Sequence, residues 1–88
     1  MPVRDRDGEI IATAVDAMAA CNGGGISYIV VSEGGVGGVG ERLHALGWGE
    51  VTMHEDGITT QLSREKLSGR PELSVGAWPA TAAAAGVG

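Results

Sequence analysis

Three glycines near the middle of the chain have the spacing that could bind a phosphate group. Gly35, Gly37 and Gly40 follow a β-branched apolar stretch at residues 26–32 and run into residues with helical spacing. Glycines in such a loop let the backbone approach a pyrophosphate, and the free N–H groups at the start of the next helix bind its negative charge. These three glycines are therefore the candidate cofactor-binding residues.

The loop resembles the glycine fingerprint of the dinucleotide-binding Rossmann proteins, because an acid, Glu55 or Asp56, follows at nearly the distance found there. Three features argue against this interpretation. Glu33 lies beside the loop and would repel phosphate, the two acids fall in the turn of an antiparallel hairpin, and 88 residues cannot supply a second nucleotide-binding half. Nucleotide or phosphate binding is thus an alternative function, and we expect no bound cofactor.

The histidines and the single cysteine are the remaining candidates for catalysis or metal binding. We expect His44 at the edge of a helical apolar stripe and His54 on the polar face of a hairpin. Cys21 falls at the C-terminal end of a predicted helix, where the dipole disfavours a thiolate. No nucleophile, base and orienting group come together, so the sequence predicts no enzyme. His54, Glu55 and Asp56 are adjacent, but neighbouring strand positions point to opposite faces, so we predict no metal site.

The chain is small and acidic. Its 88 residues and formal charge of −5 allow one domain with a modest core. The negative charge argues against direct binding of nucleic acid and suits a protein partner with a basic surface. The acids that we expect to contact such a partner lie near loop ends: Glu33, Glu55 and Asp56 first, and Glu41 second.

Cysteine usage and the charged first residues bear on location. One cysteine cannot form an intrachain disulfide, and residues 1–7 have no apolar run behind them. We therefore expect neither a signal peptide nor a membrane anchor, and a cytoplasmic protein.

Apolar spacing predicts two helices. In the first, at residues 8–21, the stripe recurs at steps of three and four: Ile10, Ile11, Ala14, Val15, Met18 and Cys21. In the second, firm from Val39 and capped by Gly47, the stripe is Val36, Val39, Leu43 and Leu46. Its outer face would carry Glu41, Arg42 and Ala45.

Alternation and turn residues predict the strands. Residues 26–32 are apolar on consecutive positions, which is typical of a strand that is central or covered on both faces. Asp56-Gly57 predicts a hairpin with a two-residue turn, in which Glu55 faces Ile58. One face of this hairpin would hold the apolar set Val51, Met53, Ile58, Thr60 and Leu62. Residues 73–78 alternate and would add a short edge strand.

The predicted fold class is α+β, in the order helix–strand–helix–strand–strand. Three or four strands form the sheet, and both helices pack on one of its faces. Residues 1–7 are expected to be a flexible arm, residues 8–78 the single domain, and residues 79–88 a flexible Ala/Gly tail.

The function that we expect is that of a non-enzymatic protein-binding module that occupies a partner's surface. Size and charge are those of inhibitors that block nucleic-acid-handling complexes, among them the anti-CRISPR proteins. The ordered domain followed by Trp78-Pro79 and a bland Ala/Gly end also resembles the leader-plus-core layout of ribosomally made precursor peptides, which is a second alternative. The sequence allows a homodimer without requiring one.

Overall fold

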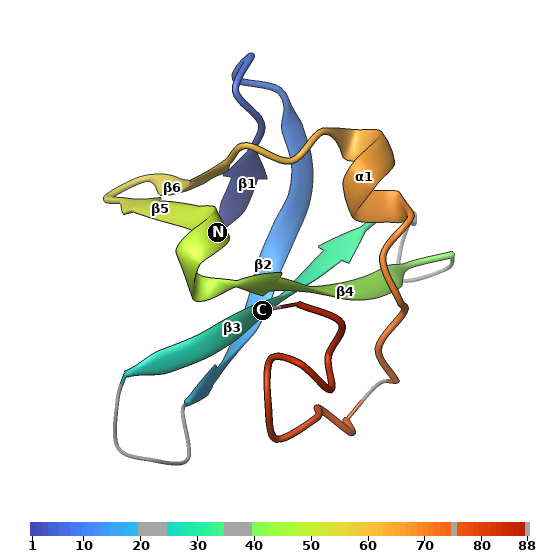
Figure 1. Cartoon of the computed structure of the whole chain (residues 1–88). Coiled ribbons are helices and arrows are strands. Elements are labelled where there is room, and N and C mark those ends of the chain that lie inside the picture. The colour runs from blue at the N-terminus through green and yellow to red at the C-terminus, as the bar shows by residue number, and fades with distance from the viewer. Residues whose placement is uncertain (20–24, 35–39, 75, 88) are drawn as a thin grey trace.

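The computed structural model of the chain describes residues 1–19, 25–34, 40–74 and 76–87. These residues form a six-stranded mixed sheet that curls into a half-barrel (Figure 1). The elements, in chain order, are β1 (Pro2–Arg4), β2 (Ile10–Ala19), β3 (Ile26–Glu33), β4 (Arg42–Gly47), the 3-10 turn η1 (Trp48–Glu50), β5 (Val51–His54), β6 (Gly57–Thr60) and the short helix α1 (Arg64–Ser68).

The strands lie in the order β4-β3-β2-β1-β6-β5. β1 pairs antiparallel with β2 and parallel with β6, and every other neighbouring pair is antiparallel. The N-terminal strand therefore joins the β2–β3–β4 meander to the β5–β6 hairpin. Within the described part of the chain, no helix is long and apolar enough to cross a membrane.

The predicted α+β fold with two helices packed on one face is wrong, because both predicted helices are strands. Residues of the first form β2, whose pairing shifts between Ala14 and Asp16 and again between Met18 and Ala19. A β-bulge adds a residue to one strand, so inward-facing positions no longer alternate strictly and can imitate helical spacing. Ile10 and Val15, expected in the apolar stripe, are 52% and 50% exposed.

The described part of the second predicted helix forms β4, and Val36 and Val39 of its predicted stripe lie outside the described residues. Leu43 and Leu46, expected on one helical stripe, pack in separate clusters on opposite faces of this strand. Ala45, expected on an outer face, is 1% exposed. Strands covered on both sides read as consecutive apolar residues, so their pattern does not distinguish them from a buried helix.

The strand at residues 26–32 and the antiparallel hairpin are confirmed. The predicted turn is wrong by one residue, because Glu55 and Asp56 form it and His54 pairs with Gly57. Gly57 lies in β6, where a Cβ atom would come within 2.8 Å of the carbonyl oxygen of Pro2. This glycine therefore allows β1 to approach rather than making the turn.

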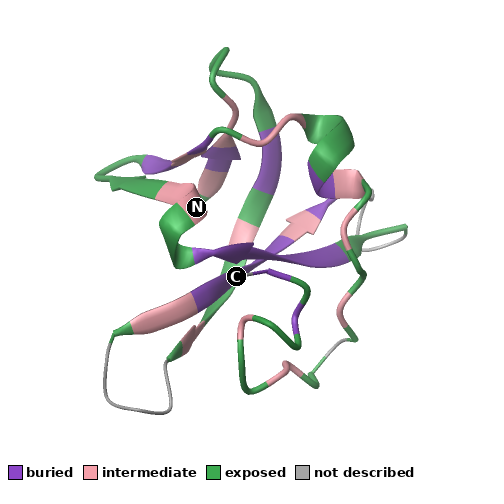
Figure 2. Ribbon diagram, viewed as in Figure 1, coloured by how far each residue is buried: buried purple, intermediate pink, exposed green. Residues whose placement is uncertain are grey.

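The core has two layers, one on each face of β3. Inside the curl, residues of β1, β2, β3, β4 and β6 pack with Leu67 of α1: Val3, Ile11, Ala12, Ile29, Val31, Leu46 and Ile58. On the outer face, Tyr28, Val30, Leu43 and Ala45 pack with Ala85 and Val87 from the C-terminal segment. Figure 2 shows buried residues along β3 and β4, whereas β5 and the adjoining turn are mostly exposed.

Both ends of the described chain take part in this packing. Residues 2–4, expected within a flexible arm, form β1, and Val3 is fully buried. In the expected flexible tail, Ala85 and Val87 are 2% and 6% exposed. Residues 73–78 were expected to form an edge strand, and the described residues among them contribute an isolated bridge between Ser74 and Ala77.

Candidate functional site

A buried polar network lies at the α1 end of the half-barrel interior. Glu33 and His44 come from β3 and β4, and Glu33 Oε1 lies 2.9 Å from His44 Nε2. Ser68 of α1 donates its hydroxyl to Glu33 Oε2 at 2.6 Å, and His44 Nδ1 lies 3.2 Å from the carbonyl oxygen of Pro71. Arg42 adds an ion pair to Glu33 at 3.4 Å. The network ties the segment after α1 to the two strands.

Glu33 is the charged centre of this network. Burial on its own raises the pKa of Glu33, but hydrogen bonds from Ser68 and His44 and the charges of His44 and Arg42 together lower it below its ordinary value. Both ring nitrogens of His44 face oxygen atoms, one of the Pro71 carbonyl and one of the Glu33 carboxylate.

This arrangement does not activate a nucleophile. Glu33 stands between His44 and Ser68, so the serine hydroxyl donates to a carboxylate rather than to the imidazole. His44 is fully buried and has no face open to a substrate. The base that the serine hydroxyl does reach is the Glu33 carboxylate, and its lowered pKa makes it a poor proton acceptor. The network is therefore built for holding structure.

A second ion pair holds the same segment. Arg70 donates through both terminal nitrogens of its guanidinium group to the carboxylate of Glu50. One of them, Nη1, also donates to the carbonyl oxygen of Ala45. The hydrogen bonds from Arg70 lower the pKa of Glu50; burial opposes this, and the backbone N–H of Gly47 and the charge of Arg70 assist it. Residues 68–71 are thus fastened to β4 and η1 by charged groups that are already paired.

The β5–β6 hairpin presents the opposite situation. β5 is the last strand of the sheet order, with β6 on one side and no strand on the other. Within the described ranges, its backbone hydrogen-bonds to no segment other than β6. Thr52, Met53 and His54 are all exposed. β5 is therefore an open sheet edge.

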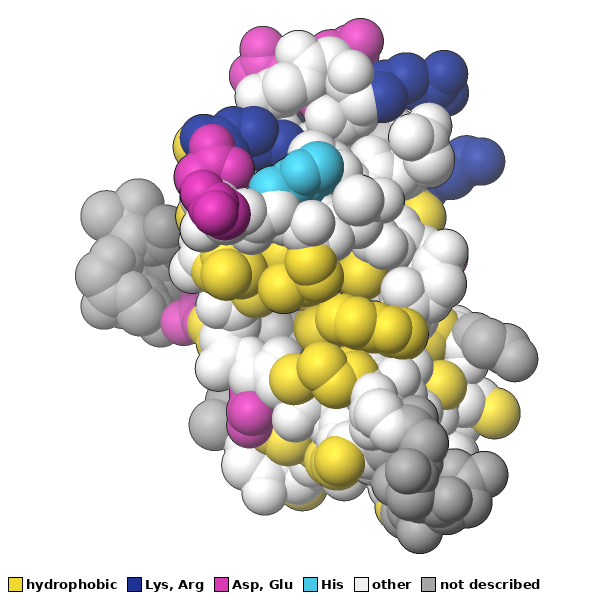
Figure 3. Space-filling view, turned by 90° about the vertical axis from the view of Figure 1, so that its left-hand side faces the viewer, with side chains coloured by type: hydrophobic (Ala, Val, Ile, Leu, Met, Phe, Trp, Pro, Cys, Tyr) yellow, Lys and Arg dark blue, Asp and Glu magenta, His cyan; other side chains and the backbone are white. Residues whose placement is uncertain are grey.

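Exposed apolar side chains lie beside this edge. Met53 of β5 is 45% exposed, Trp48 of η1 is 40% exposed, and Met1, next to β1, is 52% exposed. Figure 3 views the side on which β5, β6 and the N-terminus lie, and it shows hydrophobic side chains gathered across the middle with charged and histidine side chains above them. The edge is therefore bordered by a mixed apolar and charged surface.

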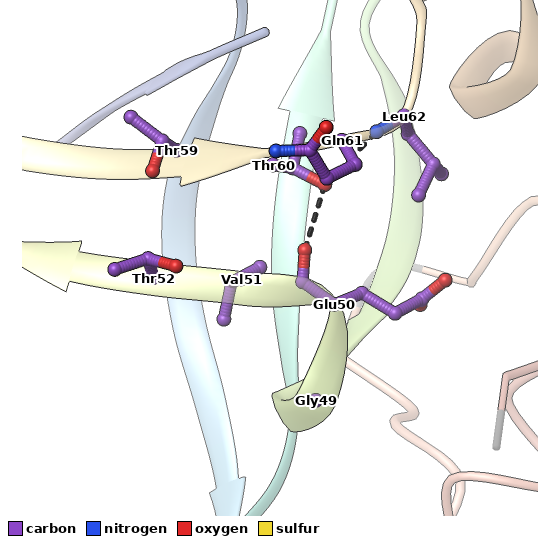
Figure 4. A pocket seen from close by; sticks show the side chains of 8 residues that line it. All are labelled: Gly49, Glu50, Val51, Thr52, Thr59, Thr60, Gln61 and Leu62. Carbon is purple, nitrogen blue, oxygen red and sulfur yellow. Dashed lines mark hydrogen bonds between the residues drawn. The ribbon is translucent and has the colours of Figure 1, made fainter. Parts of the chain in front are cut away.

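A shallow hollow of about 280 Å³ opens where β5 and β6 diverge. Its lining comes from both strands and the residues next to them: Gly49, Glu50, Val51, Thr52, Thr59, Thr60, Gln61 and Leu62 (Figure 4). The Thr60 hydroxyl donates to the carbonyl oxygen of Glu50 at 2.9 Å and accepts from the N–H of Leu62 at 3.3 Å. Thr60 thus shapes the base of the hollow, and Thr52 and Thr59 line its rim.

The acids predicted to bind a partner do not form one surface. Glu33 is buried in the network above, whereas Glu41, Glu55 and Asp56 are exposed. Glu41 precedes β4, but Glu55 and Asp56 form the β5–β6 turn, so the two groups belong to opposite edges of the sheet order (Figure 1). Glu55 and Asp56 alone adjoin the open edge.

The glycine candidates have a different outcome. Gly35, Gly37 and Cys21 lie outside the described residues. Gly40 is exposed, has a φ of 80°, and leads into strand β4 rather than a helix. The helix start on which the dinucleotide interpretation depends is therefore not present at β4. His54 is exposed, and its Nε2 lies 3.0 Å from the hydroxyl of Thr59.

Sequence reasoning found the hairpin but missed that β5 is an edge. The available signal was the absence of any charged residue from 51 to 53, combined with a hairpin that no further strand follows closely. Thr60 was expected on the apolar face of the hairpin, and the hollow that it shares with Thr52 and Thr59 was not predicted. These threonines line one hollow because β5 and β6 diverge beyond Val51, which no local sequence pattern indicates.

Together these features define a small curled β domain whose charged interior groups are paired and whose edge strand β5 is exposed. The chain belongs to the PRC-barrel family, because residues 1–67 match the family model of the PRC-barrel domain. A comparison with curated proteins gave no match. All six strands lie within the matched residues, whereas Ser68, Arg70 and the segment that covers the outer face follow them.

Proposed function

We propose that this chain is a non-enzymatic protein-binding domain that captures its partner through the β5–β6 hairpin. The observation that carries the proposal is the open edge of β5. Unpaired N–H and C=O groups along a sheet edge are a template for another chain, and natural proteins usually protect them with lysine, proline or a covering segment. Residues 51–54 contain neither lysine nor proline.

The polar interior supports a binding role over a catalytic one. His44 and Glu33 are bonded to each other and to Ser68 and Pro71, and Arg70 is bonded to Glu50. These groups stabilise the fold and are not directed at a solvent-exposed site. His54, the exposed histidine, faces a threonine hydroxyl rather than an acid or a nucleophile.

The partner is expected to carry a basic surface, since the chain has a formal charge of −5 and Glu55 and Asp56 border the edge. We expect the encounter to take place in the cytoplasm, because a single cysteine suits a reducing compartment. Inhibition of a nucleic-acid-handling complex is one form that such binding would take, and it stays a prediction from size and charge.

The test compares two variants of matched exposure as bait in a pull-down from the source cell, read by mass spectrometry. Met53→Lys places a charge on the open edge, and Val15→Lys places the same charge at a half-exposed position of β2. We expect Met53→Lys to lose the proteins that the unaltered chain retains, because an edge lysine opposes strand addition. Val15→Lys should retain them.

Urea unfolding of both variants should give midpoints close to that of the unaltered chain, which shows that lost capture is not lost folding. If both variants retain the same partners, the hairpin is not the capture site. If Val15→Lys alone loses them, the binding surface lies on β2 instead.

A further inference from the structure

We infer that the partner presents an extended segment that adds a strand to β5, with a Lys or Arg side chain against Glu55 and Asp56 and an uncharged side chain in the hollow beside Thr52. This inference rests on the proposed function, that the β5–β6 hairpin captures a protein, and it specifies the chemistry of what is captured.

The backbone of β5 offers the first contact. An antiparallel partner uses the N–H and C=O of alternate residues, so those of the remaining residues point away from β6. Strand addition supplies affinity through such main-chain bonds and specificity through pockets for alternate side chains. β5 is 4 residues long, so the ladder that it can offer is short. Side-chain contacts must therefore supply much of the affinity and the selectivity.

The hollow supplies one of these contacts. It measures about 280 Å³, is open to solvent and is lined by two short stretches of chain, so it has room for a side chain. A single side chain is therefore its natural occupant. The rim combines threonine hydroxyls and methyls at Thr52 and Thr59 with Val51 and Leu62, and Glu50, the one charged lining residue, is paired with Arg70. Such a lining favours an uncharged side chain.

The turn supplies the second contact. Glu55 and Asp56 are exposed, and no ion pair within the described ranges includes either of them. Arg4 lines a second hollow together with Asp56 and His54, so it partly offsets the local negative potential at Asp56. Glu55 has no such neighbour in that lining. A basic side chain that lies at the turn end of β5 therefore meets an unpaired carboxylate.

The separation of these contacts sets the spacing of the captured segment. Thr52 borders the hollow and Glu55 begins the turn, and a strand rises about 3.3 Å per residue. The two sites are thus roughly 10 Å apart along the edge. We expect the uncharged and basic residues to stand about three or four positions apart.

A second copy of this chain fits the edge poorly. In an antiparallel pairing of β5 with β5 that aligns Val51 with His54, Glu50 of one copy would stand opposite Glu55 of the other. Like charges directly opposite each other on neighbouring strands are destabilising. Each copy also carries a formal charge of −5, which opposes association.

The test selects from a phage-displayed library of random eight-residue peptides against the full chain, and measures selected peptides by titration calorimetry. We expect enriched peptides to carry Lys or Arg about three or four positions from an uncharged residue. N-methylation of alternate peptide amides should abolish binding in one of the two possible patterns and spare it in the other, because only one peptide edge would face β5.

Variants of the chain separate the two contacts. The double reversal Glu55→Lys, Asp56→Lys should weaken binding of a lysine-containing peptide about tenfold or more. The control Glu9→Lys, Glu65→Lys makes the same change in net charge at exposed positions away from the hairpin and should change binding less than about twofold. Thr52→Trp should fill the hollow and select for peptides with a smaller uncharged residue.

Each outcome bears on a different statement. If none of the enriched peptides loses binding to the Met53→Lys variant, the proposed function and this inference are both wrong. If peptides bind the edge but show no preference for Lys or Arg, or if the charge reversal at the turn does not affect them, the proposed partner chemistry is wrong. Capture at the β5 edge would still be supported. A dimer in sedimentation that Met53→Lys dissociates would show that a second copy occupies β5, and would overturn the inference.

Discussion

Glu33 keeps a negative charge inside the half-barrel because its neighbours replace the water that it loses. Ser68 and His44 each hydrogen-bond to one carboxylate oxygen, and Arg42 lies 3.4 Å away. A buried charge is tolerated when it is paired and its remaining lone pairs are satisfied. Glu33 therefore joins β3, β4 and α1, and its sequence-based assignment to a partner-binding surface does not agree with its buried position.

Glu33→Gln should lower the free energy of unfolding by about 2 kcal/mol near pH 7, because it removes charge-assisted hydrogen bonds. The folded-state pKa of Glu33 lies below its ordinary value, so its contribution is present at neutral pH and is lost as the pH falls through that lowered pKa. Urea unfolding should therefore show a smaller stability loss between neutral and acidic pH in the variant than in the unaltered chain.

Glu41→Gln is the matched control, since Glu41 is exposed next to β4. It should leave stability within about 0.5 kcal/mol of the unaltered chain at each pH. Equal effects of the two substitutions would contradict the structural role of Glu33. Glu50, whose pKa is also lowered, contributes stability of the same sign, so some acid dependence remains in Glu33→Gln.

At the scale of elements, the contact of β1 with β6 completes the sheet. Val3 pairs with Ile58 in parallel, and both side chains are buried in the interior cluster. Gly57, the first residue of β6, permits this approach because the carbonyl oxygen of Pro2 occupies the space of a Cβ atom. Gly57 therefore lies at a contact between two segments that are distant in the sequence.

Gly57→Ala should destabilise the fold by about 1–3 kcal/mol, because the methyl group forces β1 and β6 apart. Thermal or urea unfolding measures this, and hydrogen exchange should show faster exchange in β1 and β6. Gly49→Ala is the control, since a Cβ atom there meets nothing within 4 Å. A neutral effect of Gly57→Ala would show that β1 can shift without loss.

The sequence predicted β3 and an antiparallel β5–β6 hairpin correctly because local signals determine them, although it misplaced the turn by one residue, and the pairing with it. Consecutive β-branched residues specify a strand, and apolar alternation places Met53 and Ile58 on the same side of the hairpin, as their pairing confirms. The helices at Ile10 and Leu43 were wrong because β2 contains bulges and β4 is buried on both faces. Helical spacing is informative only where a single face is buried.

The candidate site was predictable only in part. The acids of the turn, Glu55 and Asp56, were correctly expected to be exposed near a hairpin end. Which strand ends the sheet depends on β1 inserting between β2 and β6, a pairing of residues 3 and 58 for which no local pattern exists. The network around His44 likewise requires Ser68 and Pro71 to fold back over β4.

At the scale of the whole molecule, the segment after the matched PRC-barrel residues acts as a second layer. It follows residues 68–71, which are bonded to β4 and η1, and it covers the outer face of β3 and β4. The hydrogen bonds that anchor it include those from Leu73 N–H to the Leu43 carbonyl oxygen, from the Tyr28 hydroxyl to the Pro79 carbonyl oxygen, and from Trp78 Nε1 to Asp16. Its buried side chains are small, so each contributes little apolar area.

Ala85→Asp should detach this segment, because it would bury an unpaired carboxylate against Tyr28 and Val30. The uncovered apolar face should then bind the dye ANS and promote self-association, measured by fluorescence and sedimentation. Ala83→Asp makes the same substitution at an exposed position two residues earlier and should do neither. Identical behaviour of both variants would show that the segment does not protect the face.

The insertion of β1 between β2 and β6 also has a kinetic consequence. β1 is made before β6 and acquires this parallel neighbour only after residue 60 has been made, so the half-barrel cannot close progressively from β1 onward. Topologies dominated by such distant pairings fold slowly, on the order of milliseconds to seconds. Until then the sheet of β1, β2, β3 and β4 exists with the edge of β1 awaiting β6, and that interval is when a nascent chain of this protein is most exposed to aggregation.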